Sequence, residues 1–124
     1  MTITVTLRED KSPELSGINL IFEVVSTEKH RFCIYMTPLE DFAGDILDVQ
    51  DEHGISMPYL GRMIKRRPPT WFDHTTLYPE KGKLIQFNLA EHYQIPSSGS
   101  LSVQFKGRPA LNSLPNSNIL SIEI

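Results

Sequence analysis

Histidine, cysteine and carboxylate side chains are the first candidates for chemistry, and their spacing is unfavourable for a metal site. The four histidines lie at positions 30, 53, 74 and 92. No pair has the His-x-x-x-His spacing of a zinc helix, and no HExxH motif occurs. His30 and Cys33 are three residues apart in a predicted strand, so their side chains should leave on opposite faces. We therefore expect no bound metal and no cofactor.

The remaining candidates for catalysis have simpler structural explanations. Asp73 and His74 are adjacent, and we expect a turn in which Asp73 is the capping residue. Glu40 and Asp41 form a carboxylate pair without a partner motif. The Ser98-Gly99-Ser100 sequence predicts a turn, because no strand–turn–helix pattern surrounds it. With no glycine-rich phosphate loop either, we expect that the protein is not an enzyme.

The most unusual stretch is Pro58–Pro69, called the basic segment below. Four of the twelve cationic residues of the chain fall within six of its positions. Prolines at both ends fix φ and remove backbone donors, and Gly61 permits a bend or a close approach. Two interpretations stay open: a strand with a solvated basic face, or a binding element presented on a rigid β scaffold. On the second, the partner-binding residues are Tyr59, Arg62, Lys65, Arg66, Arg67 and Trp71.

Composition limits the class of partner. The net charge is −3 and the isoelectric point is about 5.8, which argues against a general nucleic-acid binder. A basic segment in a mildly acidic chain favours a specific acidic partner. No apolar run is long enough for a membrane helix and no secretory signal is recognisable, so we expect a cytoplasmic protein. A secreted location stays open if a leader has been removed.

Short alternating segments predict the fold. Apolar and polar residues alternate in eight segments separated by turn signals, and no helical period is sustained. The segments are 2–7, 18–25, 31–36, 46–50, 55–59, 84–89, 101–105 and 120–124. We expect one domain over residues 1–124, an all-β antiparallel immunoglobulin-like sandwich of about seven to nine strands. Apolar residues on both faces of segment 18–25 indicate a central strand.

Three further predictions concern side chains and a loop. Cys33 is the only cysteine and has apolar neighbours, so we expect a buried thiol. Trp71 and Phe72 could pack on the core or be exposed, and we expect them in the core because large aromatic residues are usually buried. Residues 107–118 are rich in Pro, Asn, Ser and Gly and predict a long loop.

Residues 18–105 resemble the small N-terminal, propeptide-like β domain of bacterial deuterolysin-like (aspzincin) metallopeptidases. The resemblance is carried by Thr37-Pro38-Leu39-Glu40, by Asp48-Val49 and by the Pro-Tyr-x-Gly-Arg-x-x-Lys-Arg pattern that begins at Pro58. Pro69, Asp73, Leu77, Pro79 and Gly82 recur at similar intervals, with two extra residues between Pro79 and Gly82. No HExxH peptidase motif accompanies them, so we expect a free-standing copy without the catalytic domain.

The resemblance implies a non-catalytic domain that binds a metallopeptidase as an inhibitor or propeptide-like partner. Lys65 matches the lysine of the family pattern and is its first candidate contact. Two alternatives stay open. The domain could be an accessory module that pairs through a strand edge, or a small-ligand or glycan binder that uses Trp71, Phe72 and Tyr78 as stacking surfaces.

Overall fold

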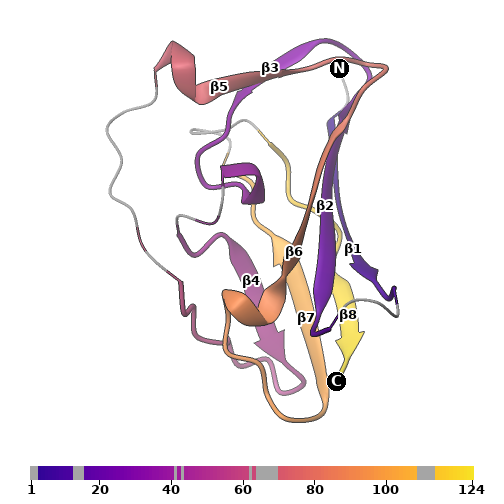
Figure 1. Ribbon diagram of the computed structural model, residues 1–124, viewed down its shortest axis with the longest axis vertical. Coiled ribbons are helices and arrows are strands. Elements are labelled where there is room, and N and C mark those ends of the chain that lie inside the picture. The colour runs from indigo at the N-terminus through magenta and orange to yellow at the C-terminus, as the bar shows by residue number, and fades with distance from the viewer. Residues whose placement is uncertain are drawn as a thin grey trace.

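The computed structural model describes residues 3–12, 16–40, 42, 44–61, 63, 70–108 and 114–124, without the side chains of Glu40 and Trp71. These residues form eight strands and three short 3₁₀ helices, and no α-helix occurs among them (Figure 1). The strands are β1 (Ile3–Asp10), β2 (Asn19–Ser26), β3 (His30–Cys33), β4 (Leu47–Asp51), β5 (His74–Leu77), β6 (Lys83–Asn88), β7 (Ser100–Phe105) and β8 (Leu120–Glu123). The 3₁₀ helices are η1 (Pro38–Glu40), η2 (Trp71–Asp73) and η3 (Leu89–Glu91). The predicted all-β class is confirmed.

The strands form three antiparallel sheets, ordered β1-β2-β6, β3-β5 and β4-β7-β8. The prediction that segment 18–25 is a central strand is confirmed, since β2 lies between β1 and β6. In the register of this sheet, Leu7 faces Phe22 and Phe22 faces Ile85. Directly opposed residues share a face, so this row of apolar side chains points to one side.

The apolar faces of the two three-stranded sheets meet in one core. Phe22 of β2 and Phe105 of β7 are fully buried, and their rings contact edge to face with centroids 5.0 Å apart. Alternation along β7 buries Leu101, Val103 and Phe105 and leaves the intervening residues partly exposed. The core is therefore built from the period-two pattern that predicted the strands.

One asparagine connects the two sheets where β1 passes β8. The Asn118 amide donates to the Leu7 carbonyl at 3.0 Å and accepts from the Leu7 amide at 2.8 Å. A side chain thereby takes the place of a neighbouring strand at the middle of the β1 edge. An edge strand occupied in this way cannot pair with another chain at that point.

Three predicted segments differ from the structure. In place of the strand expected over 55–59 there are only isolated bridges, from Ser56 to Gln50 and from Tyr59 to Tyr93. The strand expected over 31–36 ends at Cys33, because Met36 has a left-handed φ of 57° and the Thr37 hydroxyl donates to the Ile34 carbonyl at 2.7 Å. The segment 107–118 is not simply a surface loop, since Leu114 and Ser117 are buried. Cys33 is buried as predicted. None of the helices in the described ranges has the length and apolar content needed to cross a membrane.

Candidate functional site

The first residues of the basic segment are fixed to the β scaffold. The Leu60 amide donates to the His92 carbonyl at 2.8 Å, and the Gln94 amide donates to the Pro58 carbonyl at 2.9 Å. Between these two bonds, Tyr59 and Tyr93 form an antiparallel bridge. The start of the basic segment is therefore hydrogen-bonded to the residues that immediately follow η3.

Tyr59 packs toward the protein and serves as an anchor. Its ring lies 5.4 Å from the ring of Tyr93, and its hydroxyl donates to the Phe42 carbonyl at 3.3 Å. A β-carbon at Gly61 would lie 2.7 Å from Tyr59 Cζ, so the close approach expected at Gly61 is confirmed. Tyr59 is half-buried, and its contacts with Tyr93 and Phe42 join it to the scaffold.

Tyr93, against which Tyr59 packs, is itself fixed in the core. It is almost fully buried, and its hydroxyl accepts from the Leu47 amide at 2.9 Å and donates to Asp45 Oδ1 at 2.6 Å. Burial, together with the hydrogen bond to Asp45, raises the pKa of Tyr93 well above its ordinary value. Tyr93 is therefore un-ionised at neutral pH and acts structurally.

A capped turn follows the far end of the basic segment. The Asp73 carboxylate accepts from the Thr70 amide at 2.8 Å and from the Thr70 hydroxyl at 3.1 Å. The Asp73 amide in turn donates to the Thr70 carbonyl at 3.0 Å. This is the predicted turn with Asp73 as the capping residue, and it leads directly into β5.

Three of the described apolar side chains in and beside the basic segment are exposed. Leu60, Met63 and Phe72 are 59%, 70% and 88% exposed. The prediction that Phe72 packs in the core is wrong, because the tight Thr70–Asp73 turn directs it outward. Trp71 lies in η2, but its side chain is outside the described residues. Arg62, Lys65, Arg66 and Arg67 are also outside them, so their role in binding stays a prediction.

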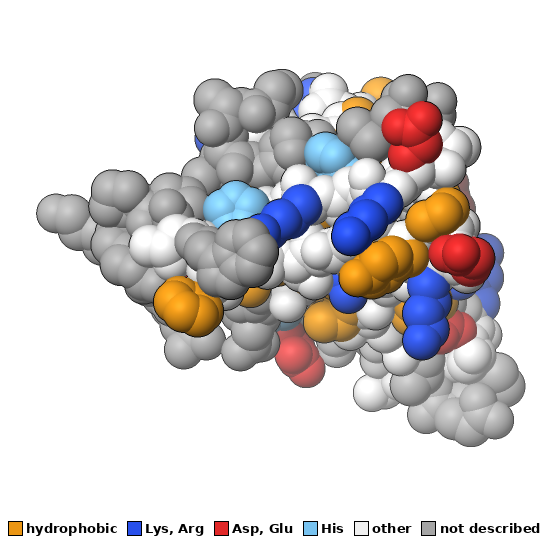
Figure 2. All heavy atoms as spheres, turned by 90° about the horizontal axis from the view of Figure 1, so that it is seen from above, with side chains coloured by type: hydrophobic (Ala, Val, Ile, Leu, Met, Phe, Trp, Pro, Cys, Tyr) orange, Lys and Arg blue, Asp and Glu red, His pale blue; other side chains and the backbone are white. Residues whose placement is uncertain are grey.

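The proposed stacking surface for a small ligand is not a single platform. Phe72 precedes β5 and Tyr78 follows it, so the two aromatic residues lie at opposite ends of that strand (Figure 1). Tyr78 is half-exposed, and Lys29 Nζ lies 5.7 Å from its ring centroid. Viewed from the β3–β5 end, Lys or Arg side chains lie among hydrophobic ones (Figure 2).

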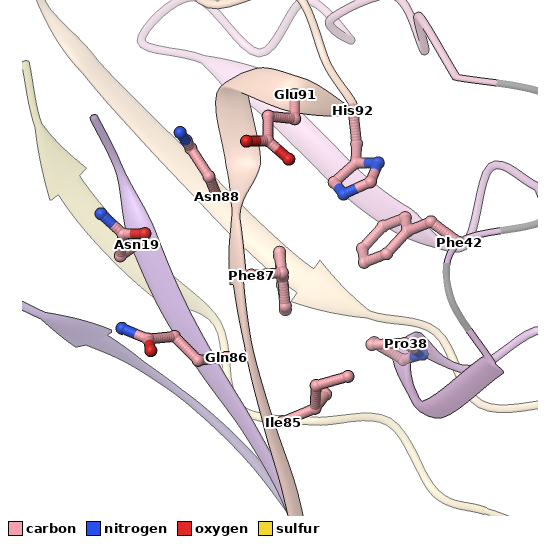
Figure 3. Close-up of a pocket in the computed structure, with 9 residues that line it drawn as sticks. All are labelled: Asn19, Pro38, Phe42, Ile85, Gln86, Phe87, Asn88, Glu91 and His92. Atoms are coloured by element: carbon pink, nitrogen blue, oxygen red, sulfur yellow. The ribbon is translucent and has the colours of Figure 1, made fainter. Parts of the chain in front are cut away.

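A pocket of about 330 Å³ lies beside β6, on the same side of the molecule as η1 and η3 (Figure 3). Its lining comprises Asn19, Pro38, Phe42, Ile85, Gln86, Phe87, Asn88, Glu91 and His92. β6 runs through the middle of Figure 3, with Gln86 and Asn88 to one side of the strand and Ile85 and Phe42 to the other. The pocket therefore has a polar wall and an apolar wall.

The apolar wall depends on a strained residue. Phe42 has φ of 45°, which is unusual for a bulky side chain and costs about 1–3 kcal/mol. This conformation stacks the Phe42 ring on His92, with centroids 3.8 Å apart and an interplanar angle of 11°. Phe87 contacts Phe42 at 4.9 Å. No sequence pattern predicts this pocket, because Phe42 and His92 are far apart in the chain and are brought together only by the tertiary fold.

No family model matches the chain, and no curated protein matches it in sequence. In the described ranges, no group of three or more His, Cys, Asp or Glu side chains is placed to hold a metal ion. The resemblance to peptidase-associated domains therefore stays a prediction.

Proposed function

We propose that the protein is a non-catalytic protein-binding domain that contacts an acidic partner surface through the basic segment. The observation that carries this proposal is the exposure of Leu60, Met63 and Phe72 next to four cationic residues, on a segment fixed at its start and followed by a capped turn. Exposed apolar residues beside Arg and Lys are common in protein-binding surfaces, where the apolar groups supply affinity and the charges supply specificity. Anchored ends also lower the entropy lost on binding.

We further propose that the fold is an immunoglobulin-like β-sandwich. The sheets β1-β2-β6 and β4-β7-β8 would be its two layers, and the Phe22–Phe105 contact between them supports this assignment. In such a fold, loops at the ends of the layers are the usual binding elements, which suits a basic segment that follows β4 in the chain.

For the partner, we propose a metallopeptidase, on the strength of the family pattern that begins at Pro58. Lys65, the residue that matches the lysine of that pattern, would enter an acidic specificity pocket of the peptidase. The domain would then act as an inhibitor or as a propeptide-like partner.

Lys65→Glu tests this proposal. It should abolish partner binding and leave the melting temperature nearly unchanged, because surface substitutions usually change stability by no more than about 0.5 kcal/mol. Binding is measured by affinity capture from a lysate of the source organism, with mass spectrometry to identify partners and an Arg62/Lys65/Arg66 triple-alanine variant beside the wild type.

A metallopeptidase captured by the wild type and lost from both variants would support the proposal, and inhibition of that peptidase by the wild type alone would establish the inhibitory role. Equal capture by all three proteins would exclude the basic segment as the site. Unfolding of Lys65→Glu would instead show that Lys65 has a structural role.

A further inference from the structure

A second hollow lies between β5, β6 and η1. The two strands leave the Tyr78–Lys81 turn in different directions, and η1 lies in the angle between them (Figure 1). The hollow has a volume of about 530 Å³. It is lined by Ile34, Leu39, Thr75, Gly82, Lys83 and Leu84. Small-molecule sites have volumes of roughly 300–1,000 Å³, so this space is large enough for a ligand.

Lys83 enters the hollow from the core-facing side of β6. It lies directly opposite Val24 in the β2–β6 ladder, and Val24 is fully buried. Opposed residues share a face of the sheet, so the Lys83 side chain leaves β6 on the same side as Ile85 and Phe87. Lys83 is half-buried, and within the part of the chain that the structure describes it has no ion-pair partner.

Thr75 reaches the same hollow from the other sheet. It lies opposite Phe32 in the β3–β5 ladder, and Phe32 is buried, so Thr75 also faces the core side. Its hydroxyl makes no hydrogen bond within the described ranges. The hollow therefore receives an ammonium and a hydroxyl from strands of two different sheets, and none of its described lining residues is acidic.

The rest of the lining is mostly aliphatic. Ile34 and Leu39 are partly buried and pack against the core, and Leu84 is 58% exposed. Covering this apolar surface is favourable, and a half-buried charge is costly unless it is paired. A ligand that meets both demands carries an anionic group for Lys83 and an apolar chain for the aliphatic side chains.

We propose that this hollow binds a small amphipathic carboxylic acid, such as a medium-chain fatty acid, in its ionised form. One carboxylate oxygen would accept from the Lys83 ammonium and the other from the Thr75 hydroxyl. The acyl chain would lie on Ile34, Leu39 and Leu84. Two donors match the two oxygens of a carboxylate better than the three of a phosphate group. The site is separate from the basic segment, and the two proposals can fail independently.

The test uses octanoate as the probe and octanol, which has the same chain without the charge, as its control. Binding to the full chain is measured by amide shifts in NMR spectra. We expect octanoate to bind about tenfold or more tightly than octanol, because only octanoate forms a charge-assisted bond with Lys83. The largest amide shifts should be at Thr75, Lys83 and Leu84.

A matched pair of protein variants tests the role of the lysine. Lys83→Met keeps an unbranched apolar side chain and removes the charge, whereas Lys81→Met makes the same change of charge in the exposed turn before β6. We expect Lys83→Met to weaken octanoate binding about tenfold or more and Lys81→Met to leave it nearly unchanged. Neither variant should lose affinity for octanol.

Thr75→Val removes the hydroxyl and keeps the shape of the side chain. It should weaken octanoate binding about threefold or more, and it decides the matter if Lys83→Met does not fold. Melting temperatures show which variants are folded. Full octanoate affinity in a folded Thr75→Val would overturn the proposal.

An inward-facing lysine on an edge strand can instead serve only to prevent pairing with another chain. In that case Lys83→Met would self-associate and bind octanoate as tightly as the wild type, which would overturn the proposal. Equal affinity of the wild type for octanoate and octanol would also overturn it, as would failure of octanoate to bind at millimolar concentration. Loss of octanoate binding in Lys81→Met or in the Arg62/Lys65/Arg66 triple-alanine variant would overturn it by moving the anion elsewhere.

Discussion

At the scale of single residues, the hydroxyls of Tyr93 and Tyr59, which face each other, contribute differently to stability. The Tyr93 hydroxyl is buried and bonds to both the Leu47 amide and the Asp45 carboxylate. The Tyr59 hydroxyl makes a longer bond, 3.3 Å, from a half-buried position. Removing the Tyr93 hydroxyl leaves the buried Leu47 amide without its acceptor. Removing the Tyr59 hydroxyl leaves no buried donor without an acceptor in this way.

Tyr93→Phe should therefore lower the free energy of unfolding by about 1–3 kcal/mol, the usual cost of a buried polar group that loses its partner. Tyr59→Phe is the matched control and should have a clearly smaller effect. Urea denaturation followed by circular dichroism measures both. Equal effects would mean that the hydrogen bonds of the Tyr93 hydroxyl to Leu47 and Asp45 do not stabilise the fold more than the Tyr59 hydroxyl does.

The ionisation of Tyr93 gives a second prediction. Since its pKa in the folded protein is raised above the ordinary value of 10.0, folding favours the un-ionised form. The stability from this difference is fully present below pH 10 and is lost as the pH rises above it. In alkaline urea titrations, the stability advantage of the wild type over Tyr93→Phe should shrink. A constant advantage up to the pH at which the wild type unfolds would contradict this assignment.

Residue patterns predicted local features better than the environments of aromatic side chains. The capping role of Asp73 and the burial of Cys33 follow from local sequence and are confirmed. Phe72 is exposed although its type favours burial, because a four-residue turn fixes its direction. The stacking of Phe42 on His92 could not be predicted, since it needs a left-handed Phe42 and the placement of η3 beside it.

At the scale of elements, alternation identified most of the strands but missed β5, and it did not identify which strands pair. Period two is a property of one segment and can be found in the sequence, whereas pairing depends on contacts between distant segments. The two apolar faces of segment 18–25 accordingly predicted β2 as a central strand. No pattern predicted that β3 and β5 form a separate two-stranded sheet, or that Asn118 occupies the edge of β1.

Asn118→Ala tests whether that asparagine stabilises the contact between β1 and β8. The substitution removes two hydrogen bonds to the Leu7 backbone, and we expect a loss of about 1–2 kcal/mol in the free energy of unfolding. Asn116→Ala is the control, because Asn116 also accepts a backbone hydrogen bond, from Gly107 at 2.8 Å, but does not connect two sheets. Chemical denaturation of both variants gives the comparison, and similar losses would show that Asn118 acts only within its own loop.

At the scale of the whole molecule, the distribution of charge favours binding of a partner at one local surface. The chain is net negative, so general electrostatic attraction cannot bring it to an acidic partner. Binding to an acidic partner therefore needs a local concentration of cationic residues, and the basic segment contains a third of the Lys and Arg residues of the chain. Its anchored start at Pro58–Leu60 and the capped turn at Thr70–Asp73 connect that charge to the β scaffold.

The most direct test of the basic segment as a binding site is site-specific photo-crosslinking. A photoreactive amino acid replaces Met63, which is 70% exposed in the basic segment, or Ile119, which is 65% exposed before β8. In lysate of the source organism, we predict that the Met63 position crosslinks to a discrete protein, that the Ile119 position does not, and that Arg62/Lys65/Arg66 triple alanine abolishes the product. The same crosslinked protein from both positions, or from the triple-alanine variant, would contradict the assignment of the basic segment as the binding site.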